Sequence, residues 1–178
     1  MTFVEAITNA GSGWSKILAG KPDWNEHFAF DAPALNRGFV LYFAGVLFSI
    51  VALAVRYGMP VPVVMLIVMA GYILPVLAFI FATSLGKRVL KFEAPIVTIY
   101  VPGLYMLALM AFIGGLTLLV GVQLWGVIVT LTAFFLFRLA RVAAGADFAP
   151  ALGFALINFL AGLPLALYMM GGGFAVFA

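Results

Sequence analysis

The densest group of residues that could carry out chemistry lies in one short segment near the start of the chain. Asp23, Glu26, His27 and Asp31 fall within nine residues of sequence. A histidine beside carboxylates can supply acid–base or metal chemistry. Four such residues in a polar segment are more often solvated. The chain also has a single histidine and no cysteine, so it cannot form a histidine cluster or a thiolate site. We predict no catalytic, cofactor-binding or metal site, and keep a lipid-acting enzyme that uses His27 as an alternative.

The composition is that of a protein immersed in lipid. Hydrophobic residues make up 66% of the 178 residues and charged residues only 8%, against about 45–50% and about 25% in soluble domains. The six acidic residues all fall outside the long apolar runs. Because intramembrane charges usually mark ion and proton paths, a proton-coupled pump is disfavoured. Nucleic-acid binding is not expected either, since the basic residues are spread along one predicted membrane face.

The uncharged runs predict five transmembrane helices, because a hydrocarbon core of about 30 Å needs roughly 20 apolar residues. The run 94–137 is too long for one helix, and the Gly-Val-Gln-Leu-Trp-Gly sequence at 121–126 predicts a turn inside it, with Trp125 at the membrane interface. The apolar runs do not alternate with polar residues as barrel strands would. We therefore predict an all-α polytopic bundle at 35–170, after a cytoplasmic segment at 1–34 and before a short tail at 171–178. The predicted spans are 38–55, 60–83, 96–119, 124–142 and 148–170.

The first residues predict an amphipathic helix that lies on the membrane surface. Its apolar residues recur at helical spacing: Phe3, Val4, Ile7, Ala10, Trp14, Ile17 and Leu18. Gly11 and Gly13 weaken this helix, each by about 1 kcal/mol relative to alanine. The helix either docks a partner or membrane surface, or simply anchors against the bundle.

The basic residues are distributed unevenly about the predicted spans. Eight of the nine lie on one side, and only Arg56 lies on the other. The positive-inside rule places the eight-residue side in the cytoplasm. We expect the N-terminus in the cytoplasm, the C-terminus outside, and a location in a bacterial inner membrane.

Several residues are candidates for binding or packing. Five basic residues could contact anionic lipid headgroups or a partner: Lys87, Arg88, Lys91, Arg138 and Arg141. Asn158 is the candidate buried polar residue, expected to hydrogen-bond another helix. Ala108, Ala111 and Gly115 share a face that could pack within the bundle or against a second copy, and Gly45 and Ser49 form a similar pair. Helix kinks are expected at Pro75, Pro102 and Pro164.

The architecture resembles the Yip family of Rab-interacting membrane proteins, and especially its small bacterial relatives. The residues behind this resemblance are Lys21-Pro22-Asp23-Trp24, the basic loop at Lys87 to Lys91, and the segment from Arg138 to Asp147. It covers Trp14 to Met170 and implies a non-enzymatic membrane adaptor or organiser. Eukaryotic members carry an Asp-Leu-Tyr-Gly-Pro motif, which Phe30-Asp31-Ala32-Pro33 does not reproduce, so a Rab-linked role is not carried over.

We therefore predict a non-catalytic organiser, adaptor or scaffold in the inner membrane. Its expected partners are membrane lipids and either a second copy of the chain or another membrane protein. The alternatives are a transporter or channel component for a neutral or apolar solute, suggested by the prolines, the tyrosines and Asn158, and the lipid-acting enzyme considered above.

Overall fold

The computed structural model describes residues 2–89, 92 and 94–170, and it confirms the predicted all-α five-span fold. Its elements are α1 (Phe3–Ala19), the 3-10 helix η1 (Pro22–His27), α2 (Ala32–Tyr57), α3 (Pro62–Arg88), α4 (Ile96–Leu119), α5 (Trp125–Val142) and α6 (Phe148–Met170). Helices α2 to α6 are each long and apolar enough to cross a bilayer. The chain is an integral membrane protein.

Two of the spans extend beyond their predicted bounds. α2 begins at Ala32, six residues before the predicted start at 38, because Asp31 caps it and a proline occupies its first turn. The carboxylate of Asp31 accepts a hydrogen bond of 2.7 Å from the Ala34 N–H. Helix α3 continues to Arg88, five residues beyond its predicted end at 83. α4 and α6 have the predicted bounds.

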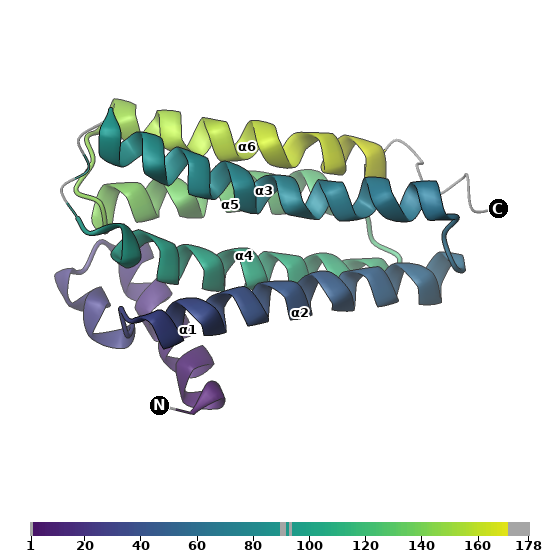
Figure 1. The fold of residues 1–178 in the computed structure, drawn as a ribbon, viewed down its shortest axis with the longest axis horizontal. Helices are drawn as coiled ribbons and strands as arrows, with labels where there is room; N and C mark the ends of the chain where they lie inside the picture. The colour runs from purple at the N-terminus through teal and green to yellow at the C-terminus, as the bar shows by residue number, and fades with distance from the viewer. Residues whose placement is uncertain (1, 90–91, 93, 171–178) are drawn as a thin grey trace.

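The five long helices form two layers. In Figure 1, α2 and α4 run side by side in one layer, and α3, α5 and α6 form the other, in which α6 contacts both α3 and α5. One end of the bundle holds the starts of α2, α4 and α6 and the ends of α3 and α5, and α1 and η1 gather there (Figure 1). We call this the α1 end.

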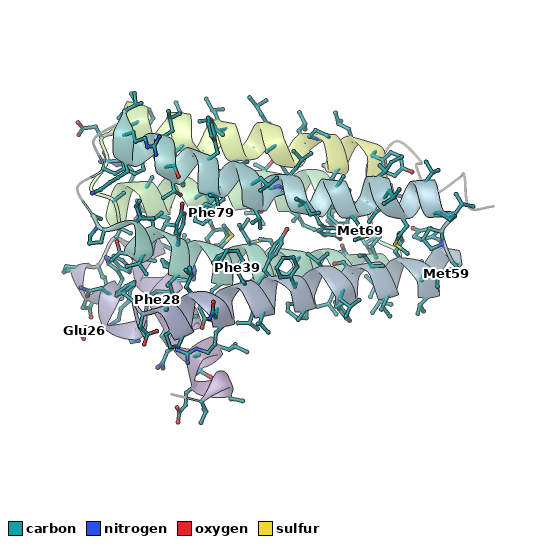
Figure 2. The ribbon with its side chains drawn as sticks, viewed as in Figure 1. Glu26, Phe28, Phe39, Met59, Met69 and Phe79 are labelled. Atoms are coloured by element: carbon teal, nitrogen blue, oxygen red, sulfur yellow. The ribbon has the colours of Figure 1, made fainter. Side chains whose placement is uncertain are left out.

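Phe79 fills the space between the layers. Its side chain is fully buried, and Figure 2 shows it between α3 and α4. Its ring meets Tyr100 of α4 and Phe154 of α6 edge-on, with ring centroids 5.8 and 6.0 Å apart. A Cβ added to Gly103 would lie only 2.1 Å from the Phe79 ring, so the glycine makes room for the aromatic core.

The three prolines expected to kink helices lie inside α3, α4 and α6, and each helix continues past its proline. Side chains from other helices bind the backbone beside two of them. The Tyr42 hydroxyl donates a hydrogen bond to the Tyr72 carbonyl, three residues before Pro75. Trp14 Nε1 donates to the Pro102 carbonyl at 2.9 Å. Both bonds join two elements of the fold through buried backbone carbonyls.

Candidate functional site

Helix α1 is fastened to the bundle at its C-terminus. Gly20 ends it in a left-handed conformation, at φ 71°, which glycine adopts without a Cβ clash. The Arg138 guanidinium, from α5, donates hydrogen bonds to the carbonyls of Ile17 at 3.2 Å and Leu18 at 2.7 Å. The last carbonyls of a helix lack partners within the helix and carry partial negative charge, so a cation suits this position. Arg138 therefore holds α1 in place.

Trp14 provides the second attachment. Its indole N–H bonds the Pro102 carbonyl of α4, and its ring meets Phe135 of α5 edge-on at 5.5 Å. The residue is buried, as are Ala6, Ala10 and Ile17 on the same face of α1. This face of α1 therefore packs against the bundle, which was one of the two alternatives predicted for the helix. α1 nevertheless leaves the bundle across its long axis, as Figure 1 shows.

The glycine at position 13 has a structural purpose that the sequence did not reveal. A Cβ at Gly13 would lie 2.3 Å from the ring of Phe28, which follows η1. Phe28 is buried and contacts Trp24, Phe30 and Tyr105. The aromatic segment after α1 is therefore packed against α1 and α4. Gly13 costs helix propensity but permits this contact.

Two of the three acidic residues near His27, Asp23 and Asp31, have structural roles. Asp23 pairs with Lys16 at 2.5 Å, and this hydrogen bond lowers the pKa of the Asp23 carboxyl. Asp31 caps α2. His27 Nε2 is buried and has no hydrogen-bond partner among the described residues. Within those residues, no three His, Asp or Glu side chains come together as a metal site.

The candidate basic residues are engaged to different degrees. Lys87 donates hydrogen bonds to the Phe92 and Ala94 carbonyls at 2.9 and 3.0 Å, and so closes the loop after α3. Arg141 Nη1 binds the Ala146 carbonyl at 2.9 Å, beyond the end of α5. The Arg88 side chain is exposed. Lys91 lies outside the described residues.

The small residues of α2 and α4 face each other. A Cβ at Gly45 would lie 3.0 Å from the Ala108 carbonyl oxygen and 3.1 Å from the Ala111 Cβ. The Ser49 hydroxyl donates to the Ala111 carbonyl at 2.6 Å, and a Cβ at Gly115 would lie 3.0 Å from Ser49 Oγ. We call these five residues the seam. The structure places the candidate packing face inside the bundle, where small side chains let two helices approach closely.

Asn158 is buried, but its hydrogen bond differs from the one expected. Nδ2 donates to the Phe154 carbonyl at 2.8 Å, one turn back in the same helix, and not to another helix. Oδ1 has no partner among the described residues. An unpaired buried acceptor costs about 1–3 kcal/mol. The sequence alone could not distinguish the two partners, because an asparagine inside a helix can donate either to the carbonyl four residues before it or to a neighbouring helix.

Two further residues, Tyr72 and Trp125, lie beside Asn158, and neither was a predicted site residue. Trp125, interpreted as a membrane-interface residue, is buried at the start of α5 and meets Tyr72 edge-on at 6.0 Å. Both residues line a cavity of about 60 Å³ together with Asn158. The only signal in the sequence was an aromatic residue bordering a turn, and this is also typical of an interface position.

Comparison of the whole chain with protein-family models, with curated proteins and with solved structures finds no match. The geometry of the chain itself must therefore support any proposal about its function.

Proposed function

We propose that this chain is a non-catalytic organiser or adaptor of a bacterial inner membrane, which holds α1 and η1 at the cytoplasmic surface as a docking platform. The observation that carries this proposal is the attachment of α1 by Arg138. A helix that only floated on lipid would not need a cation from α5 bound to its last carbonyls. The resemblance to the Yip family agrees with this function.

The charge distribution supports the orientation. The described basic residues at the α1 end are Lys16, Lys21, Arg37, Lys87, Arg88, Arg138 and Arg141. Arg56 lies at the opposite end, where it packs against Gly121. By the positive-inside rule the α1 end faces the cytoplasm, and α6 ends on the outer side.

Helix α1 has three faces, which are buried, apolar and exposed, and polar. One face packs on the bundle. A second face, which includes Val4 (73% exposed) and Ile7 (47% exposed), is apolar and accessible. The remaining face carries Glu5, Ser12 and Lys16, which are spaced four and seven residues apart and so lie together. This arrangement favours a helix whose apolar face enters the cytoplasmic leaflet and whose polar face is open to a partner.

Site-specific photo-crosslinking in native membranes tests the platform. A photoreactive residue at Ser12, on the polar face of α1, should give a protein adduct, whereas one at Val40, on the exposed face of α2, should give none. Arg138→Met should abolish the Ser12 adduct while leaving the amount of folded protein unchanged. It removes both hydrogen bonds that hold the last carbonyls of α1, whereas the five spans keep their contacts with one another.

Arg138→Lys provides the matched control, because it keeps the charge but not the forked geometry, and should give an intermediate amount of adduct. The proposal is wrong if Ser12 gives no protein adduct in membranes that contain the chain at its normal level. It is also wrong if the Arg138→Met variant crosslinks as well as the unaltered protein.

A further inference from the structure

A cavity lies between the two layers of the bundle, away from the platform. It encloses about 60 Å³ and is bordered by residues of α2 to α6. Most of its wall is formed by apolar residues, among them Leu107, Val129 and Leu165. No charged side chain lines it. Its polar lining residues are Tyr42, Tyr72, Trp125, Thr132 and Asn158.

Three of these polar residues carry a buried atom without a hydrogen-bond partner. They are the Tyr72 hydroxyl of α3, Trp125 Nε1 of α5 and Asn158 Oδ1 of α6. The three residues are only 5%, 3% and 5% exposed. In the described part of the chain, five side-chain atoms are buried in this way, so most of them belong to the wall of one cavity. Inside a bilayer no bulk water is available to satisfy them.

The chemistry of the two best-defined atoms is complementary. An indole nitrogen can only donate a hydrogen bond. Asn158 already uses its Nδ2 to donate to the Phe154 carbonyl, and since a carbonyl can only accept, the open atom of this amide is the acceptor Oδ1. Of the other polar groups of the wall, the Tyr42 hydroxyl binds the Tyr72 carbonyl and the Thr132 hydroxyl binds the Ile128 carbonyl at 2.7 Å, while the Tyr72 hydroxyl is open.

We propose that this cavity binds a small neutral molecule of the carboxamide or urea class. The carbonyl of the molecule would accept from Trp125 Nε1, and its N–H would donate to Asn158 Oδ1. A water molecule needs about 15 Å³ of such space, so the cavity suits an occupant of roughly four non-hydrogen atoms. An ion would find no counter-charge in the wall, and a purely apolar molecule would leave both polar atoms unpaired. This site is independent of the platform function.

Indole N–H resonances provide a direct test. The full-length protein, with ¹⁵N-labelled tryptophan, is reconstituted in nanodiscs of phosphatidylethanolamine and phosphatidylglycerol and titrated with acetamide. The chain has three tryptophans. We expect a saturable downfield shift of the Trp125 signal only, because Trp14 already donates to Pro102 and Trp24 lies at the α1 end. Isobutene, which matches acetamide in shape but cannot hydrogen-bond, should leave the Trp125 signal in place.

Two variants identify the acceptor and the donor. Asn158→Leu should weaken acetamide binding by at least about tenfold, as expected for loss of one buried hydrogen bond. Asn36→Leu, at an exposed position near the start of α2, is the matched control and should bind normally. If Asn158→Leu does not fold, Trp125→Phe keeps the aromatic ring, and the rise in unfolding temperature produced by acetamide should disappear.

Three results would overturn the proposal. The first is no saturable response of Trp125 to acetamide or urea, which would mean that the cavity holds water alone. The second is an equal response to isobutene. The third is unchanged acetamide binding in the Asn158→Leu variant. If that variant does not fold, unchanged stabilisation of Trp125→Phe by acetamide counts in its place. Crosslinking at Ser12 does not depend on any of these results, so the platform and the cavity can fail separately.

Discussion

The two sides of α4 are packed in opposite ways. Toward α2, the seam brings backbones together, and its one hydroxyl, on Ser49, is hydrogen-bonded to Ala111. Toward the other layer, the ring of Trp125 stands between helices beside Tyr72, and a cavity of about 60 Å³ remains, with Asn158 Oδ1 unpaired. Where the facing side chains are small, the two helices are in close contact and the buried hydroxyl is hydrogen-bonded. Where they are large and aromatic, the helices are held apart. A separate hollow of about 260 Å³ lies outside this contrast, where α1 meets α2 and α4.

Enlarging a seam glycine should have the largest effect. Gly45→Leu places a side chain against the Ala108 carbonyl and Ala111, which cannot move without displacing α4. We expect the free energy of unfolding to fall by about 3 kcal/mol, the upper part of the usual range for overpacking. Reversible unfolding in mixed SDS and detergent micelles measures this change.

Gly153→Ala in α6 is the control for that experiment. A Cβ there meets nothing within 4 Å, so the change should be within about 1 kcal/mol and favourable, because alanine has the higher helix propensity. If both variants unfold alike, the seam is not tightly packed and the contrast between the two sides of α4 is lost.

Removing the hydroxyl of the seam should have a smaller effect. Ser49→Ala loses the hydrogen bond to the Ala111 carbonyl and should cost about 1 kcal/mol, within the range measured for such bonds between membrane helices. The same unfolding assay applies. Thr130→Val is the comparison, since its exposed hydroxyl binds only its own helix, at the Gly126 carbonyl. A larger loss from Thr130→Val than from Ser49→Ala would contradict this interpretation.

On the cavity side, added volume should be tolerated. Val129→Ile introduces one methylene into the wall and should stabilise the bundle by up to about 0.8 kcal/mol, the value of one buried CH₂ group. It should also weaken acetamide binding, because it reduces the space available. If Val129→Ile instead lowers the free energy of unfolding by more than about 1 kcal/mol, as in a core that is already filled, the cavity has no room for the added methylene.

The smallest expected effect is on pH dependence, and it should be confined to the α1 end. The pKa of Asp23 is lowered by its hydrogen bond from Lys16, so the stabilisation is present above the ordinary pKa of about 3.9 and is lost as the pH falls below it. Asp23→Asn should shift the Trp24 indole resonance at pH 7, and this difference should vanish at acidic pH. A difference that persists through acidification would rule out the ion pair as its cause.

Neither the seam nor the cavity contains a carboxylate or a basic side chain. The Trp125 resonance should therefore not change with Trp24 in this titration. A change in both resonances would mean that the α1 end and the cavity are coupled, so the two regions could not be treated as independent.

Five membrane helices could be predicted from composition alone, because long uncharged runs are stable only in lipid, where a helix pairs all of its own backbone groups. The sequence also located the ends of α4 and α6, and placed small residues of α2 and α4 at spacings that favour close packing. These properties depend on composition and local periodicity, which are visible along one chain.

The contacts between distant residues became visible in the folded structure. It assigned Arg138 to the carbonyls at the end of α1, turned Gly13 from a weak point into a contact for Phe28, and buried Trp125 instead of leaving it at the interface. It also left Asn158 Oδ1 unpaired beside a cavity. Each of these outcomes depends on residues that are distant in sequence. Because lipid-facing and core-facing positions are equally apolar in this chain, hydrophobic periodicity alone cannot tell which face of a helix turns inward.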